Sequence, residues 1–112
     1  MMKSAAALGA WLVQRVSAIY MLCFIVFVLF QSAFDAPRPY AAWHDWIMRP
    51  GMRVALAAFF AALLAHAWVG LRDVIMDYVH GITIRVVLLG LISVSLAAAG
   101  IWIVQILWAR QA

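Results

Sequence analysis

Acidic side chains are scarce in this chain of 112 residues. It has no glutamate, and its four aspartates stand against eight lysines and arginines. Charged residues make up 11% of the sequence and hydrophobic residues 70%, which is far outside the composition of soluble domains. The single cysteine, Cys23, excludes an intrachain disulfide and an iron–sulfur site held by this chain's own cysteines. The basic residues lie at the ends of apolar segments or in short loops, which favours membrane anchoring over nucleic-acid binding.

Three segments contain no charged residue at all: residues 16–34, 54–71 and 86–109. A helix rises ~1.5 Å per residue, so each segment is long enough to cross ~30 Å of hydrocarbon. With flanking turns, the predicted membrane helices cover residues 12–34, 52–79 and 84–110. Three spans take up most of the chain, which predicts an all-α integral membrane protein with one domain, residues 1–112. Nothing remains for a soluble catalytic domain.

The parts between the spans carry weaker signals. The first ten residues are expected to form a short interfacial lead, and Gly81 is expected to end the second helix. The loop at residues 35–51 contains all three prolines and several aromatic residues, which predicts a short surface helix at headgroup level. The third span carries small residues on one helical face, which predicts tight packing against another helix. These are Gly90, Ser93, Ala97 and Gly100.

His66 lies deep in the second apolar segment. At ~100° per residue, Gly70, Asp73 and Asp77 project with it within a sector of ~40° to 60°. An imidazole in hydrocarbon needs a partner, and ionisable residues inside a membrane are candidates for function. Two interpretations stay open: a histidine hydrogen-bonded to a serine or a backbone carbonyl of a neighbouring helix, or a metal ligand.

Gly70 favours the second interpretation, because a missing side chain one turn beyond His66 leaves room for a broad, flat macrocycle such as haem. Ligation of haem by two histidines needs another imidazole. His44 and His80 lie in loops on opposite sides of the membrane, and neither reaches the depth of His66. The second ligand is therefore expected to come from another chain.

Charged residues gather where the second span ends. Aspartates near a helix C-terminus, and Arg85 near the start of the next helix, are each disfavoured by the helix macrodipole. Both conflicts ease if Arg72 and Arg85 pair with Asp73 and Asp77, and a solvated cluster of ion pairs is the simplest interpretation of this region.

Tyr78 and Arg15 complete the candidate residues. A phenol beside the carboxylate of Asp77 can hold a quinone carbonyl and supply protons, whereas the alternative is a tyrosine of the interfacial aromatic belt. Arg15 lies on the same membrane side, about one turn outside the first apolar core. It either reaches lipid phosphate or binds a haem propionate.

Together these residues resemble a known family. The stretch "HAWVGLRDVIMDYV" is similar to the pattern H-A-W-x-G-x-x-x-V-x-x-D-Y-V of the smaller membrane anchor of bacterial succinate dehydrogenase (succinate:quinone oxidoreductase, complex II). The arginine in "VQRVSAIY", which opens the first span, and the three-span layout extend the resemblance over nearly the full length.

The resemblance implies roles for four residues. His66 would be one axial ligand of a haem b shared with the larger cytochrome b anchor, within a haem-binding helix bundle that both anchor subunits form. Arg15 matches the residue that contacts haem propionates. Tyr78 matches the tyrosine that hydrogen-bonds ubiquinone, and Asp77 the neighbouring carboxylate. No role transfers to Arg72.

The resemblance also implies location and partners. The partners would be the larger cytochrome b anchor, the iron–sulfur subunit and the flavoprotein subunit, in the bacterial inner membrane with a cytoplasmic N-terminus and a periplasmic C-terminus. Counting basic residues does not decide this orientation, because four lie on each side. Succinate chemistry would take place in other subunits, and this chain would help to pass electrons from succinate to ubiquinone.

Three alternatives stay open. The chain is also compatible with the anchor of a related fumarate reductase, or with a haem-free scaffold subunit. A small transporter is the third, but such proteins need a carboxylate inside the membrane, and the charge-free spans contain none.

Overall fold

The computed structural model describes residues 2–35 and 39–109, and its regular elements are all helices. In chain order they are α1 (Met2–Phe34), α2 (Tyr40–Ile47), α3 (Pro50–Tyr78), α4 (Ile82–Val104) and the π-helix η1 (Gln105–Ala109). Helix α1, helix α3, and α4 continued by η1 are each long and apolar enough to cross a membrane. The predictions of an all-α membrane chain with three spans, and of a short helix in the loop, are confirmed. That the chain is a single domain stays a prediction.

Two predicted helix boundaries are wrong. Helix α1 begins at Met2 instead of after a separate lead, because the alanine-rich start of the chain contains no proline that would break it. Helix α3 ends at Tyr78, where Val79 turns to extended backbone, and Gly81 is the N-cap of α4 with a φ of −80°. Gly81 therefore starts the next helix instead of ending α3. Arg110, the predicted last residue of the third span, lies outside the described residues.

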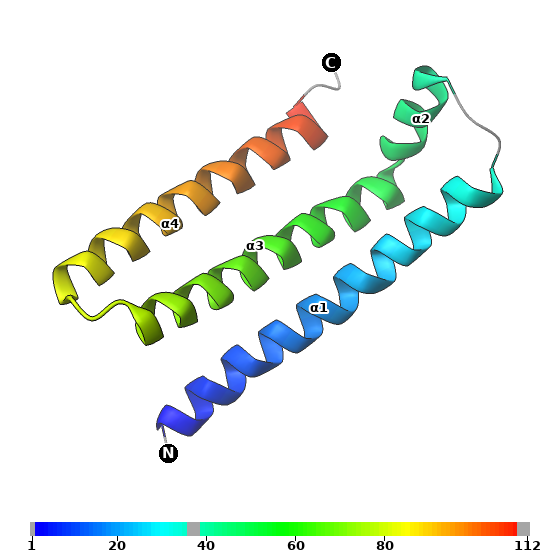
Figure 1. Ribbon diagram of the computed structural model, residues 1–112. Helices are drawn as coiled ribbons and strands as arrows, with labels where there is room; N and C mark the ends of the chain where they lie inside the picture. Colours follow the sequence, from blue (N-terminus) through cyan, green and yellow to red (C-terminus); the bar gives the residue numbers. More distant parts are fainter. Residues whose placement is uncertain (1, 36–38, 110–112) are drawn as a thin grey trace.

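The long helices form a layer one helix thick. Helix α3 lies between α1 and α4 and packs against both of them (Figure 1). The molecule is elongated, with extents of 52 × 28 × 22 Å. Because each helix has neighbours only at its sides, both broad faces of the layer remain open.

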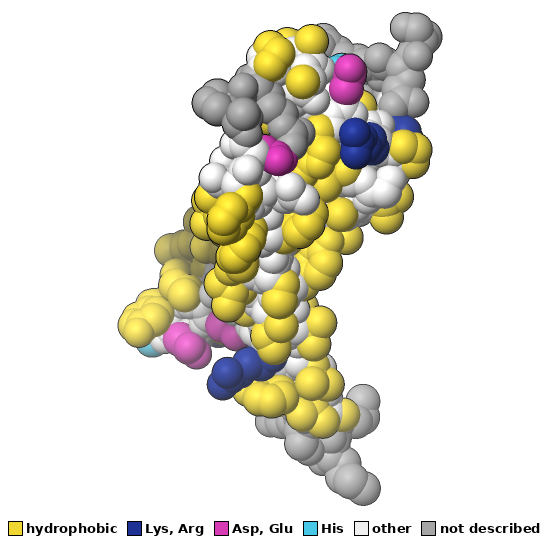
Figure 2. Space-filling model, turned by 90° about the vertical axis from the view of Figure 1, so that its right-hand side faces the viewer, with side chains coloured by type: hydrophobic (Ala, Val, Ile, Leu, Met, Phe, Trp, Pro, Cys, Tyr) yellow, Lys and Arg dark blue, Asp and Glu magenta, His cyan; other side chains and the backbone are white. Residues whose placement is uncertain are grey.

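Few side chains are shielded from the surroundings in such a layer. Within the described part of the chain, the buried residues are Ser17, Val69, Ile75 and Leu107. Hydrophobic side chains run along the middle of the molecule, and charged side chains gather toward its two ends (Figure 2). This distribution is suited to a membrane, where apolar faces meet lipid or another subunit and charges stay at the headgroups.

Two of the contacts that hold α1 against α3 involve aromatic side chains. The hydroxyl of Tyr20 donates a hydrogen bond of 2.8 Å to the backbone carbonyl of Ala55. One turn further along, the rings of Phe24 and Phe59 lie 4.9 Å apart between centroids.

Helices α3 and α4 approach each other closely at Gly100. A side chain placed at Gly100 would put its Cβ 3.3 Å from Leu64 Cδ1, so glycine permits the close approach there. The other small residues of α4 do not pack within this chain. A Cβ at Gly90 would meet nothing within 4 Å, and Ser93 and Ala97 are exposed. The predicted small-residue face therefore packs tightly against α3 only at its Gly100 end, and the rest of that face is open in this chain.

Replacing Tyr20 with phenylalanine tests the contact between α1 and α3. Hydrogen bonds between membrane helices contribute about 0.6 kcal/mol on average, so we expect Tyr20→Phe to lower the unfolding free energy by about that amount. The measurement is SDS denaturation of the purified protein. Tyr40→Phe is the matched control, because Tyr40 is exposed on α2. Equal stability of both variants and the wild type would contradict the contact.

Candidate functional site

A hydrogen bond joins His66 of α3 to Ser17 of α1. The distance between His66 Nδ1 and Ser17 Oγ is 3.0 Å. Ser17 is the buried polar residue among the side chains described, so this pair lies in the best-shielded polar environment found between the two helices. A serine on a neighbouring helix is the partner expected under the first interpretation of His66, and that part of the interpretation is confirmed.

The other contacts of Ser17 indicate the direction of this hydrogen bond. Ser17 Oγ lies 3.2 Å from the carbonyl oxygen of Gln14 and also contacts that of Val13. An oxygen can approach carbonyl oxygens this closely only if its single proton points toward one of them. Ser17 Oγ is then the acceptor for His66 Nδ1–H, and in a neutral imidazole protonated on Nδ1 the lone pair is on Nε2. A histidine that donates from Nδ1 and presents a free Nε2 is the form that binds a metal through Nε2.

Gly70 faces Gln14 of α1. A Cβ at Gly70 would lie 3.7 Å from Nε2 of Gln14, a residue of α1. The Oε1 atom of Gln14 is buried and has no hydrogen-bond partner within the described part of the chain. The role expected for Gly70, leaving room for a macrocycle, stays a prediction, because a Cβ there would make only an ordinary van der Waals contact with Gln14.

Open space lies beside Ser17, the hydrogen-bond partner of His66. An apolar groove of about 560 Å³ runs between α1 and α3. Its α3 wall is made of Ala58, Ala61 and Ala62, and Ser17 lies on its α1 wall. Ala62 precedes His66 by one helical turn, so the groove reaches the level of the imidazole. The alanine-rich run before His66 is the signal in the sequence for this space, since small side chains leave a helix face hollow.

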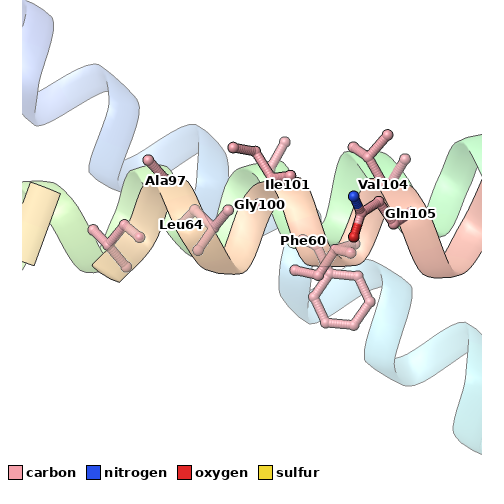
Figure 3. A pocket seen from close by; sticks show the side chains of 11 residues that line it. Phe60, Leu64, Ala97, Gly100, Ile101, Val104 and Gln105 are labelled. Atoms are coloured by element: carbon pink, nitrogen blue, oxygen red, sulfur yellow. The ribbon is translucent and has the colours of Figure 1, made fainter. Parts of the chain in front are cut away.

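A second groove lies between α3 and α4 (Figure 3). It has a volume of about 520 Å³ and is lined almost entirely by apolar side chains, with Phe60 and Leu64 on α3 and Gly100 and Ile101 on α4. None of the predicted site residues lines it. Ala61 of α3 lines both grooves.

The charged end of α3 differs from the prediction. Arg72 does pair with Asp73, at 3.3 Å, in an exposed ion pair of little energetic weight. Arg85 does not pair with a carboxylate of the described residues. Its Nη2 donates to the carbonyl of Met76 at 2.9 Å, and its Nε donates to the carbonyl of Val79. These carbonyls lie at the end of α3. The arginine was expected to pair with aspartates there, but it binds the negative end of the helix dipole directly.

Tyr78 and Asp77 lie together at the end of α3. Tyr78 is 76% exposed, and the Asp77 side chain is exposed as well. Both side chains are thus available to a molecule or a subunit at this membrane surface. The eleven residues from His66 to Asp77 correspond to ~16 Å along the helix axis.

The structure does not bring Arg15 next to His66. Arg15 precedes Ser17 by two residues, which is ~200° around the helix, so it lies on the side of α1 away from α3. Its guanidinium lies 5.4 Å from the centre of the Trp11 ring. Among the described residues, no group of three or more histidines, cysteines or acidic residues is arranged to hold a metal ion.

Comparisons with known proteins identify the chain's relatives. Residues 1–105 match the family "Succinate dehydrogenase/Fumarate reductase transmembrane subunit". The chain belongs to this family. It is also 30% identical, over 98 residues, to a succinate dehydrogenase hydrophobic membrane anchor subunit from Coxiella burnetii, a match that covers 88% of this chain and 85% of that protein. The chain is therefore a multi-pass membrane anchor of the succinate dehydrogenase and fumarate reductase group, as its sequence predicted.

Proposed function

We propose that this anchor subunit shares one haem b with a second anchor subunit and helps to form the ubiquinone site of a succinate:ubiquinone oxidoreductase. The observation that supports the proposal most is the hydrogen bond from His66 Nδ1 to Ser17. In the neutral imidazole this bond leaves the lone pair on Nε2, and Ser17 itself lines an open apolar groove between α1 and α3.

The residues of this chain fit a haem in two respects. His66 would supply one axial nitrogen, and Ser17 would hold the imidazole in the required tautomer. The groove walled by small side chains would receive an apolar macrocycle edge. A bound haem would accept and return single electrons near the quinone site. The second axial histidine would come from the larger cytochrome b anchor, since His44 lies on α2 and His80 follows α3, far along the chain from His66.

Arg15 is proposed as a ligand of a haem propionate, on the family resemblance alone. Its position on the outer side of α1 means that only its long side chain can reach a propionate, and it would have to leave the Trp11 ring to do so. A guanidinium is well suited to a carboxylate because it can donate two parallel hydrogen bonds.

Tyr78 and Asp77 would act on ubiquinone at the membrane surface. The Tyr78 hydroxyl would donate a hydrogen bond to a quinone carbonyl, which draws electron density to that oxygen and makes reduction easier. The Asp77 carboxylate, one residue away and open to water, would pass protons to the reduced ring. Succinate oxidation itself would occur in the flavoprotein subunit, with electrons delivered through the iron–sulfur subunit.

This proposal sets the location of the chain. The end of α3 that carries Tyr78 would meet the iron–sulfur subunit, so the N-terminus, on the same side, would be cytoplasmic and the C-terminus periplasmic, in the bacterial inner membrane. The anchor of a fumarate reductase is the alternative within the family, because the same residues would serve the reverse reaction. A haem-free scaffold is the second alternative.

Replacing His66 with alanine tests the haem proposal. The complex purified through this chain should show a b-type signal in its dithionite-reduced minus oxidised spectrum. We expect His66→Ala to shift or abolish that signal, because one axial nitrogen is lost. His44→Ala and His80→Ala are matched controls that should leave it unchanged. An intact complex without any haem signal would leave only the haem-free alternative.

Replacing Tyr78 with phenylalanine tests the quinone proposal. Loss of one hydrogen bond to the reacting group should lower succinate:ubiquinone activity about 10-fold to 100-fold. Reduction of an artificial dye by succinate, which needs only the soluble subunits, should not change. Tyr40→Phe at the other end of the membrane spans is the control. Full ubiquinone reduction by Tyr78→Phe would remove Tyr78 from the site.

A further inference from the structure

Arg85 of α4 donates hydrogen bonds to the end of α3 on both sides of the candidate quinone residues, Asp77 and Tyr78. Its Nη2 donates a 2.9 Å hydrogen bond to the carbonyl of Met76, and its Nε donates to the carbonyl of Val79. Met76 and Val79 bracket Asp77 and Tyr78 in the sequence. One guanidinium therefore holds the backbone immediately before and after this pair.

The hydrogen bonds from Arg85 matter because the end of α3 lacks a glycine cap. The last turn of a helix leaves carbonyls without intrahelical partners, and these usually need a glycine cap, water or a side-chain donor. Here Val79 is extended, with φ −99° and ψ 124°, so no left-handed cap forms. The planar fork of an arginine supplies two donors in fixed geometry, which a single point charge such as lysine does not.

The side chains of Asp77 and Tyr78 cannot secure their own positions within this chain. Both are exposed, and Tyr78 is 76% exposed, so no packing around them fixes where the phenol lies. Their placement follows from the backbone that carries them. The backbone N–H of Arg85 also donates a 2.9 Å hydrogen bond to the carbonyl of Gly81, the N-cap of α4, so the same residue takes part in the first turn of α4.

Arg72 provides a contrast at the same end of α3. Its guanidinium contacts Asp73, its sequence neighbour, in an exposed ion pair within a single helix. Arg85, in contrast, connects α4 to the end of α3 through backbone carbonyls. The two arginines therefore lie at one membrane surface, but Arg72 binds a carboxylate of its own helix and Arg85 binds backbone carbonyls at the end of another helix.

We propose that Arg85 is a positioning residue for quinone binding: by holding the carbonyls of Met76 and Val79, it fixes the backbone from which Tyr78 and Asp77 reach the substrate. This inference rests on the proposed role of Tyr78. It assigns to Arg85 no contact with quinone. Loss of the guanidinium lets the end of α3 fray, so the phenol samples several positions and binds quinone less well.

The test is a double-mutant cycle in the assembled complex, with the KM for ubiquinone, the kcat and the haem content measured for each variant. We expect Arg85→Ala to raise KM about tenfold, with haem content and dye reduction near the wild-type values. In a Tyr78→Phe background the same change should raise KM by less than about twofold, because the group that Arg85 positions is already gone. Arg72→Ala is the matched control and should leave KM unchanged.

The outcomes separate the two proposals. If Tyr78→Phe raises KM but Arg85→Ala does not, the positioning role is overturned and the quinone proposal stands. If Tyr78→Phe has no effect, the role of Tyr78 fails and the positioning role fails with it. Equal effects of Arg85→Ala in both backgrounds would show a general structural role and overturn the inference.

A variant that keeps the charge provides the test in case Arg85→Ala prevents assembly of the complex. If Arg85→Ala yields no complex, Arg85→Lys decides, because lysine retains the cation but not the two-pronged donor. We expect Arg85→Lys to assemble with wild-type haem content and a KM raised about threefold. A wild-type KM for Arg85→Lys would overturn the inference.

Discussion

The hydrogen bond between Ser17 and His66 links the chemistry of this chain to its fold. It crosses from α1 to α3 within the apolar part of the membrane helices, where an unpaired imidazole would be costly. The bond serves two purposes. It satisfies one ring nitrogen inside the chain, and it leaves the other nitrogen with a lone pair. The two interpretations of His66 are therefore compatible, because the bond to Ser17 uses only one of the two ring nitrogens.

The single layer of helices explains why this chain needs another subunit. Helix α3 carries all the proposed haem and quinone ligands except Arg15 and is supported at both sides, but the broad faces of the layer are open (Figure 1). Antiparallel neighbours are also joined at their ends by arginines. Arg85, near the start of α4, binds carbonyls at the end of α3, and Arg53, near the start of α3, donates to the carbonyl of Leu107 at 3.3 Å. Each arginine lies at a helix C-terminus, where the helix dipole is negative. The two arginines thus join α3 and α4 at both ends, while the broad faces of the layer stay open.

The fold was largely predictable and the site only in part. Long charge-free runs define three spans because the membrane leaves a chain few alternatives, and the motif around His66 identified the family. The contacts that depend on the register between helices were not predicted. The position of Gln14 of α1 beside Gly70, and of the groove along the alanines of α3, depends on how the two helices are aligned. Charge pairing led to the expectation that Arg85 binds aspartates, whereas the end of α3 at Tyr78 brings carbonyls closer than carboxylates.

The most direct measurement of the central claim is the midpoint potential of the haem in the complex purified with Ser17→Ala and with Ser17→Thr. An imidazole that donates from Nδ1 to an acceptor is a more electron-rich ligand and stabilises ferric iron. We expect Ser17→Ala to raise the potential, because the acceptor is lost, and Ser17→Thr, which keeps the hydroxyl, to stay close to the wild-type value. A haem retained at the wild-type potential in Ser17→Ala would contradict the claim that Ser17 prepares His66 for iron.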